Sequence, residues 1–453
     1  MALATASGAG AIAVIRMSGK DAFKIADSVF KSKGGKKISE ANSHTILFGD
    51  IRDGDELVDE VLASVFKNPK SFTGEDSVEI SCHGSIFIQK QILNLLSKNG
   101  CRMAKPGEYT MRAFLNRKMD LSQAEAVADL IASSSEAAHK VAMDQMRGGF
   151  SAELKVLREE LTHFASLMEL ELDFAEEDVE FADRTEMINL INRINAKIDL
   201  LIGSFELGNV IKEGVQVAII GEPNAGKSTL LNALLNEERA IVSDIAGTTR
   251  DTVEDEMVIE GIRYRFVDTA GIRKTEDTIE SLGIERTMKK AEQADVVMFL
   301  FDASTYSSEQ LESELSELKA NRNNLEKRLI LVANKVDKTE EDIEKKFQGF
   351  DSVSISAKEK SGIEELKTRL TDFVNLSALE EDQIIVTNTR HIEALRNAKT
   401  SLLEVIQGFE NQVPGDLVAI DIRKSLFHLG EITGEITTDD LLGNIFSKFC
   451  IGK

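Results

Sequence analysis

The chain has 453 residues, of which 42% are hydrophobic, so it is long enough for two to four domains with real cores. Its formal net charge of −23 argues against nonspecific attraction to nucleic acid, although it does not exclude a local basic patch. The three cysteines, Cys82, Cys101 and Cys450, are widely spaced and odd in number, which favours neither a disulfide framework nor a metal site. No apolar run is long enough to predict a membrane span and no signal peptide is apparent, so we expect a reduced, cytoplasmic protein.

Residues 1–118 are expected to form a mixed α+β domain without a phosphate-binding loop. Alternating or apolar runs predict strands at 11–16, 44–51, 58–66 and 77–81, and helical spacing predicts helices at 22–30 and 86–96. Lys105-Pro106-Gly107 predicts a chain break before 109–116. Asp53-Gly54 predicts a turn between the second and third of these strands.

A helical pattern follows and returns at the end of the chain. Apolar residues recur at helical spacing between 121 and 170 and over 187–202, and again over 391–409, 418–429 and 439–449. The acidic run at 169–180 is interpreted as a solvated connection, with pairing to a basic partner as the alternative. Because helices flank both sides of 212–376, we expect one discontinuous helical domain, made of 119–211 and 377–453, with another domain inserted into it.

The inserted segment begins with a phosphate-binding loop, Gly221-Glu222-Pro223-Asn224-Ala225-Gly226-Lys227-Ser228. It follows the apolar run 215–220 and precedes the apolar-periodic residues 230–235, which is the strand–loop–helix context that such a loop requires. Its glycines let backbone N–H groups approach phosphate oxygens, Lys227 can reach the β- and γ-phosphates, and the Ser228 hydroxyl can hold Mg²⁺. Alternating strands and helices up to about 373 predict a doubly wound, Ras-like domain.

Three later motifs select the nucleotide. Asp268-Thr269-Ala270-Gly271 can support Mg²⁺ and the γ-phosphate, and Ser356-Ala357-Lys358 can close over a base. In Asn334-Lys335-Val336-Asp337, the Asp337 carboxylate can accept from the N1–H and 2-amino groups of guanine, which adenine does not offer. The motifs therefore predict GTP.

Hydrolysis needs a group that orients the attacking water. Gly271 is followed by Ile272, where Ras-like proteins carry glutamine, so either turnover is poor or another residue supplies this role. Glu280 is a candidate, and the amide of Asn224 could ligate a monovalent cation beside the phosphates.

At this point the motifs resemble those of the tRNA modification GTPase family MnmE, also called TrmE. The resemblance rests on the phosphate loop, on Ile245-Ala246-Gly247-Thr248-Thr249-Arg250-Asp251 and on Asp268 to Gly271. Outside the GTP motifs it rests on Ser71-Phe72-Thr73-Gly74-Glu75-Asp76, on 106–110 and 112–116, and on Phe449-Cys450-Ile451-Gly452-Lys453. It extends over essentially the whole chain.

The resemblance implies a folate-binding and dimerising domain at 1–118, helical parts at 119–211 and 377–453, and a GTPase domain at 212–376. It implies a homodimer that works with the flavoprotein MnmG, as a heterotetramer, on the wobble uridine of certain tRNAs. There a carboxymethylaminomethyl-type group is added at C5 from 5-formyl- or methylene-tetrahydrofolate, and FAD enters only through the partner. Potassium would promote pairing of GTPase domains and hydrolysis. The alternative is a regulatory switch GTPase for ribosome or RNA assembly.

Residue roles carry over position by position. Folate contacts fall on Arg16, Glu79, Lys118 and Lys453, Mg²⁺ on Ser228 and Thr249, potassium on Asn224, Ser243, Ile245 and Thr248, and the water-orienting role on Glu280. GTP contacts fall on Asn224, Ala225, Gly226, Lys227, Ser228, Thr229, Ser243, Asp244, Ile245, Ala246, Gly247, Thr248, Thr249, Asp268, Thr269, Ala270, Gly271, Asn334, Lys335, Asp337, Ser356, Ala357 and Lys358. Cys450 could take part in chemistry or be a buried structural thiol.

Overall fold

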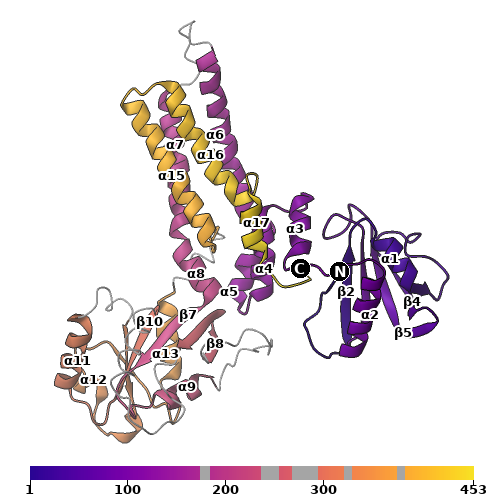
Figure 1. Ribbon diagram of the computed structural model, residues 1–453. Coiled ribbons are helices and arrows are strands. Elements are labelled where there is room, and N and C mark those ends of the chain that lie inside the picture. The colour runs from indigo at the N-terminus through magenta and orange to yellow at the C-terminus, as the bar shows by residue number, and fades with distance from the viewer. Residues whose placement is uncertain (174–183, 236–254, 268–293, 321–328, 375–382, 453) are drawn as a thin grey trace. The chain divides into compact units, whose positions relative to one another are not determined.

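The computed structural model describes residues 1–173, 184–235, 255–267, 294–320, 329–374 and 383–452 (Figure 1). Its contacts divide the chain into two compact units. The first comprises Met1–Ile131, Ala142–Ile198 and Glu393–Lys453, and the second comprises Ala132–Val141 and Asp199–Ile392. None of the described helices is long and apolar enough to cross a bilayer.

The first unit begins with a six-stranded antiparallel sheet of order β1-β2-β6-β5-β4-β3. Its strands are β1 (Ala2–Leu3), β2 (Ile12–Ser18), β3 (Phe30–Ser32), β4 (Thr45–Asp53), β5 (Glu56–Phe66) and β6 (Ser77–His83). The predicted strands and the turn at Gly54 are confirmed. Two helices, α1 (Ala22–Val29) and α2 (Ile86–Lys98), pack on one face, where the alternate residues of each strand are buried.

The opposite face of this sheet is open and carries the alternate residues. Ile12, Ile46, Phe48 and Leu62 are large apolar side chains that stay between 45% and 66% exposed on it. Arg16 of β2 lies directly across from Glu79 of β6, so strand register alone brings these two charged residues together.

The same unit contains the helical segments. They are α3 (Glu108–Leu115), α4 (Leu121–Ala132), α5 (Glu136–Met146), α6 (Gly149–Asp173), α7 (Arg184–Gly203), α15 (Thr389–Glu410), α16 (Gly415–Thr433) and α17 (Asp439–Phe446), although α5 and the ends of α7 and α15 extend into the second unit. Figure 1 shows α6, α7, α15 and α16 as a long bundle. The ion pair Arg423–Glu169 joins α16 to α6, and Arg158 of α6 pairs with Glu435, which lies just beyond the end of α16.

Two details of the helical prediction differ in the structure. The stretch 121–170 is not continuous, because it breaks at residues 133–135 and again at Gly148, whose φ of +90° ends α5. The last helix ends at Phe446 rather than at 449, because Phe449 turns back against Phe446 with ring centroids 5.2 Å apart.

The second unit is built on a six-stranded sheet of order β12-β11-β10-β7-β9-β8. Its strands are β7 (Val215–Ile220), β8 (Asp255–Ile259), β9 (Ile262–Val267), β10 (Val296–Asp302), β11 (Leu329–Asn334) and β12 (Ser352–Ser354). Every neighbouring pair is parallel except the β8–β9 hairpin, which turns at Gly261 with a φ of +77°. The described helices are α8 (Phe205–Glu213), α9 (Lys227–Leu235), α11 (Ser308–Ala320), α12 (Ile343–Lys346) and α13 (Ile363–Asp372). The carboxyl ends of β7, β10 and β11 therefore meet at one edge, where doubly wound sheets bind ligands.

Candidate functional site

The phosphate loop connects β7 to α9 and passes very close to neighbouring backbone. Gly221 has a φ of +140°, and a Cβ there would lie 2.0 Å from the Leu300 carbonyl oxygen. Gly226 has a φ of +103°, and a Cβ there would lie 2.3 Å from Asn334 Nδ2. Only glycine fits both positions, and α9 begins at Lys227, so its positive N-terminal end faces the loop.

Asn334 joins the phosphate loop to the base-binding motifs. Its Nδ2 donates to the Ala225 carbonyl oxygen at 2.8 Å, and its Oδ1 accepts from the Ala357 backbone N–H at 3.0 Å. The residue is 2% exposed, so this amide is fully committed to the protein. One side chain thus holds together the phosphate loop, the Asn334–Asp337 motif and the Ser356–Lys358 motif.

The carboxylate predicted to recognise guanine is positioned by a buried serine. Ser356 Oγ donates to Asp337 Oδ1 at 2.6 Å, and this hydrogen bond lowers the pKa of Asp337. Ser356 is itself completely buried, whereas Asp337 is exposed. Asp337 is therefore an ionised acceptor with a fixed orientation and an open side toward a ligand.

Two lysines of the site are held by protein oxygens. Lys227 Nζ donates to the carbonyl oxygens of Gly221 at 2.7 Å and Glu222 at 2.8 Å, and burial lowers its pKa. Lys335 Nζ pairs with Asp302 Oδ2 at 2.7 Å. Burial acts to raise the pKa of Asp302, but Lys335 and the Ser304 hydroxyl outweigh it and the pKa is lowered.

The sequence interpretation missed Asp302. A signal was present, because Asp302 ends the apolar run of β10, and the carboxyl ends of parallel strands share the ligand-binding edge.

Several predicted residues lie outside the described part of the chain. They are Ser243, Asp244, Ile245, Ala246, Gly247, Thr248, Thr249, Asp268, Thr269, Ala270, Gly271, Glu280 and Lys453. Among the remaining metal candidates, Ser228 is the second residue of α9, and Asn224 is exposed in the loop with a φ of +65°. Within the described residues, no group of three or more His, Cys, Asp or Glu side chains could hold a metal ion.

A second site lies on the open face of the N-terminal sheet. Arg16 pairs with Glu79, with Nε and Nη2 both 2.8 Å from Oε1, and both side chains are about one-quarter exposed. The Arg16 guanidinium lies 5.8 Å from the ring centroid of Phe72 and 5.6 Å from that of Tyr109. Its Nη1 also donates to the Gly452 carbonyl oxygen at 3.4 Å. A guanidinium, a carboxylate and two aromatic rings therefore converge at one place.

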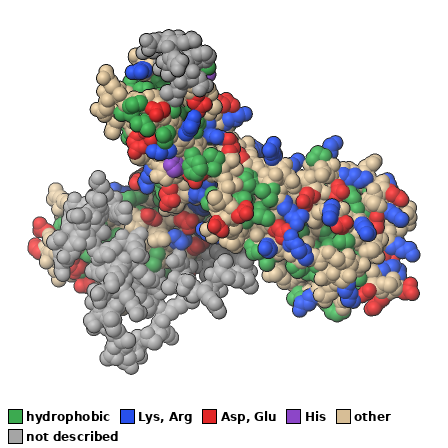
Figure 2. All heavy atoms as spheres, turned by 45° about the horizontal axis from the view of Figure 1, so that its top comes forward, with side chains coloured by type: hydrophobic (Ala, Val, Ile, Leu, Met, Phe, Trp, Pro, Cys, Tyr) green, Lys and Arg blue, Asp and Glu red, His purple; other side chains and the backbone are tan. Residues whose placement is uncertain are grey.

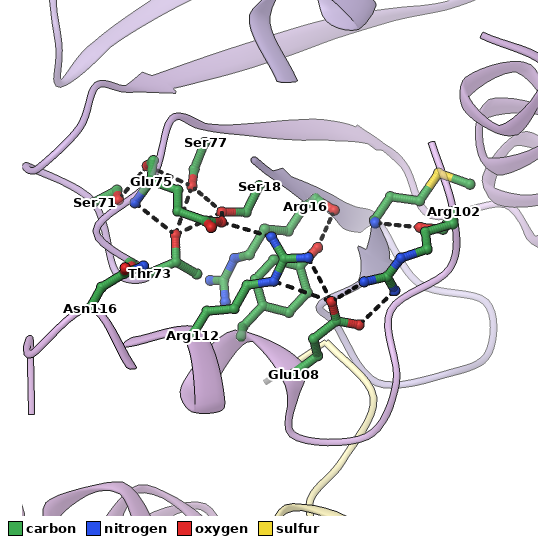
Figure 3. Close-up of polar contacts among 12 residues, drawn as sticks. Arg16, Ser18, Ser71, Thr73, Glu75, Ser77, Arg102, Glu108, Arg112 and Asn116 are labelled. Atoms are coloured by element: carbon green, nitrogen blue, oxygen red, sulfur yellow. Dashed lines mark hydrogen bonds and ion pairs between the residues drawn. The ribbon is translucent and has the colours of Figure 1, made fainter. Parts of the chain in front are cut away.

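A network behind Arg16 fixes these groups (Figure 3). Tyr109 Oη donates to the Arg16 carbonyl oxygen at 2.7 Å, and the neighbouring Glu108 accepts from Arg102 and Arg112. The hydrogen bond from Arg102 lowers the pKa of Glu108, whereas burial raises it. The Arg102 contribution is the larger, and the pKa falls to about 2. Arg112 also forms an ion pair with Glu75 at 2.8 Å, and this pair anchors the loop that carries Phe72.

Lys118 lies at the edge of the same loop, where its Nζ donates to the Pro69 carbonyl oxygen at 3.1 Å. The structure thus places Arg16 and Glu79 together, with Lys118 joined to the neighbouring loop. Phe72, Tyr109 and the Gly452 carbonyl were missed as members of this site, because no local pattern reports contacts across 56, 93 or 436 positions of the chain.

The cysteines separate by exposure. Burial raises the pKa of the Cys82 thiol to about 11, which leaves it unreactive. Cys450 is exposed, so its interpretation as a buried structural thiol is wrong. It precedes Ile451, which pairs with Pro106 as an isolated antiparallel bridge.

Comparisons with known proteins show the family of the chain. The family description "GTP-binding protein TrmE N-terminus" matches residues 1–118, and "MnmE helical domain" matches residues 121–450. The tRNA modification GTPase MnmE of Flavobacterium psychrophilum is 58% identical over 455 residues, covering 100% of this chain and 98% of that protein. The protein of the same name from Cytophaga hutchinsonii is 58% identical over 454 residues, covering 100% and 97%.

Among solved structures, the FeoB G-domain from Methanococcus jannaschii is 33% identical and covers 35% of this chain and 97% of that chain, with a TM-score of 0.25. The two family matches together span nearly the whole sequence, and the curated relatives match it from end to end. The chain belongs to the MnmE family of tRNA modification GTPases.

Proposed function

We propose that this chain hydrolyses GTP in the cytoplasm and, with the flavoprotein MnmG, adds a carboxymethylaminomethyl-type group at C5 of the wobble uridine of certain tRNAs. The one-carbon unit comes from a tetrahydrofolate. The observation that supports this most directly is that the guanine-reading site and the Arg16 site are both built in a chain whose relatives are named tRNA modification GTPases.

The GTP site acts by positioning and by charge. The phosphate loop offers backbone N–H groups and the N-terminal end of α9, Lys227 supplies a positive charge, and Asp337 accepts from the guanine edge. Asn334 keeps the base and phosphate parts in register. Bound Mg²⁺, for which Ser228 offers a hydroxyl, would neutralise phosphate charge.

We assign water orientation to Glu280 and potassium binding to Asn224 with Ser243, Ile245 and Thr248. The amide oxygen of Asn224 is a hard ligand in an exposed turn beside the phosphate position, which fits an alkali cation. GTP turnover is expected to rise strongly when KCl replaces NaCl, and Glu280→Ala should keep GTP affinity while turnover falls. Equal turnover in the two salts would remove the cation role.

The Arg16 site has the donor set for a folate. Glu79 can accept from pterin N–H groups, Arg16 can bind carboxylate or pterin acceptors, and the rings of Phe72 and Tyr109 offer stacking surfaces. Lys118 and Lys453 are proposed as further folate contacts. When bound, the folate supplies the one-carbon unit, and the protein residues hold and orient it.

The decisive experiment combines binding with modification in cells. Arg16→Ala should weaken calorimetric binding of 5-formyl-tetrahydrofolate and abolish wobble-uridine modification, measured by nucleoside mass spectrometry in cells that lack the native chain. Arg52→Ala, which removes an arginine at the other end of the sheet, is the matched control and should restore modification. If Arg16→Ala binds folate and restores modification as the parent does, the folate role is wrong.

The open sheet face supports a homodimer. Phe48 and Leu62 are directly opposite each other on β4 and β5, and Ile12 and Ile46 extend the apolar surface to both sides. A second copy could cover this face, and MnmG would then complete a heterotetramer. Phe48→Glu should convert dimers to monomers in light scattering, whereas an unchanged mass would exclude this face.

We further propose that the domain boundaries fall after residues 118, 211 and 376.

A further inference from the structure

The chain's charge is divided very unevenly. Residues 1–118 contain 17 Lys and Arg against 13 Asp and Glu, a formal net charge of +4, whereas the other 335 residues contain 37 against 64, a net charge of −27. Figure 2 shows many Lys and Arg side chains on the N-terminal domain. The domain that carries the Arg16 site therefore has a positive net charge in an otherwise acidic protein, because it contains only 13 of the 77 Asp and Glu residues.

Five lysines of this domain belong to three segments that the structure brings together. Lys67 Nζ donates to the Ser39 carbonyl oxygen at 3.2 Å and lies 6.0 Å from the ring centroid of Phe23 in α1. The Lys70 backbone N–H donates to the Lys67 carbonyl oxygen at 2.7 Å. These contacts join α1, the loop before β4 and the loop before β6 into one surface, here called the lysine ridge: Lys24, Lys36, Lys37, Lys67 and Lys70.

The carboxylates beside the ridge are used by the backbone. Asp27 accepts from the N–H groups of Ile38 at 2.7 Å and Ser39 at 3.3 Å, and Asp76 accepts from the N–H of Asn68 at 2.9 Å. Glu40 is an exposed carboxylate in the same loop. Asp27 and Asp76 thus fix the two loops that present the lysines, in the manner of turn-capping side chains.

The exposed ridge lysines are available to an outside anion. Within the described residues, Lys24, Lys36, Lys37 and Lys70 form no ion pair with a carboxylate. Lysines elsewhere in this domain do, as with Lys33 to Asp50 and Lys98 to Asp53. Four unpaired ammonium groups on two anchored loops and one helix are suited to a series of phosphates rather than to a single one.

We infer that the lysine ridge binds the sugar–phosphate backbone of tRNA. The acidic remainder of the chain does not prevent this, because charges are screened beyond about 8 Å at physiological ionic strength and the local ridge dominates at contact. The loop of Lys70 continues through Ser71 to Phe72, whose ring lies against Arg16. RNA bound to the ridge therefore lies next to the loop that forms the edge of the Arg16 site. The inference rests on the proposed function, which makes tRNA the substrate.

The test is a matched pair of charge reversals in the full chain. The ridge variant carries Lys24→Glu, Lys37→Glu and Lys70→Glu, and the control variant carries Lys90→Glu, Lys155→Glu and Lys345→Glu, so both lower the net charge equally. The probe is an unmodified tRNA transcript with uridine at the wobble position, titrated by fluorescence anisotropy over about 50 to 200 mM salt.

The ridge variant should bind tRNA roughly tenfold more weakly or worse, and its slope of log affinity against log salt should be shallower by about 2, since each lost phosphate contact removes about 0.7 to 0.9. The control variant and a Lys→Arg version of the ridge should bind like the parent. GTP turnover and folate binding should be unchanged in all variants, which excludes unfolding.

The outcomes separate this inference from the function on which it rests. If the parent binds tRNA and the ridge variant binds equally well, the ridge is not the RNA surface, while tRNA modification stands. If the control weakens binding as much as the ridge variant, net charge rather than the ridge is responsible and the inference is wrong. If cells lacking the chain keep normal wobble uridines, the proposed function itself fails.

Discussion

The ion-pair network at Glu108 makes a quantitative prediction about the support of the Arg16 site. Glu108 is the first residue of α3, its side chain is 6% exposed, and its carboxylate forms ion pairs with Arg102 and Arg112. These contacts lower its pKa from 4.5 to about 2. The pKa of Glu108 thus differs by about 2.5 between the folded and unfolded chain, and since one pKa unit corresponds to about 1.36 kcal/mol, the free energy involved is roughly 3.4 kcal/mol. Because Arg102 is 64% exposed, solvent screens its share, and we reduce the expectation to about 2 kcal/mol.

Glu108→Gln should therefore loosen the start of α3 and, through the adjacent Tyr109, the Arg16 site. Hydrogen exchange of peptides covering α3, measured by mass spectrometry on the full chain, is expected to accelerate about 30-fold. Asp53→Asn is the control, because the Lys98–Asp53 pair is 68% and 48% exposed and should contribute under about 0.5 kcal/mol.

The pH dependence gives a second readout of the same carboxylate. Its pKa is lower in the folded chain than in the unfolded chain, so its stabilisation is complete above about pH 4.5 and is lost as pH falls toward 2. The difference between parent and Glu108→Gln should shrink over that range. A change in α3 exchange below twofold at pH 7, or a difference that persists undiminished at low pH, would refute the reasoning.

Three further substitutions follow from single contacts. Gly226→Ala would push a Cβ to 2.3 Å from the bridging amide and should reduce GTP affinity at least about 100-fold by calorimetry. Gly349→Ala, with a similar φ of +102° and nothing within 4 Å, should leave affinity unchanged. Asp302→Asn removes a charge-assisted bond to the lysine of the base-binding motif and should speed GDP release roughly tenfold in stopped-flow measurements; a change under twofold would contradict it. Asn195→Leu should raise the thermal midpoint, since Asn195 is buried and neither amide atom has a hydrogen-bond partner among the described residues; a lower midpoint would count against this.

The residues proposed for the GTP site could be predicted from the sequence because their motifs are local. Gly226, Lys227 and Asp337 are each identified by a short pattern that follows an apolar strand, and the topology of a parallel sheet brings the ends of such strands together. Asn334 ends β11 in the same way, and its side chain meets the phosphate loop through a hydrogen bond to Ala225 that spans 109 positions.

What the sequence could not predict depends on tertiary register. The side chain of Tyr109 in α3 contacts Arg16 in β2 across 93 positions, and no periodicity in either segment predicts that contact. The linear sequence likewise shows no cluster at the lysine ridge, because Lys24, Lys37 and Lys70 lie in separate segments with acidic residues between them. Long-range packing creates such surfaces, while local patterns determine only the elements that carry them.

The carbonyl of Gly452 has a consequence for how the chain matures. It accepts a hydrogen bond from Arg16, which lies 436 positions earlier in the chain. A Cβ on Gly452 would lie 2.5 Å from the Leu3 carbonyl oxygen, so the last residues of the chain pack directly against β1. During translation, the N-terminal domain emerges long before this partner exists. A ribosome-bound or C-terminally clipped polypeptide therefore lacks the Gly452 contact, and the Arg16 cluster is completed only when synthesis reaches the last residues.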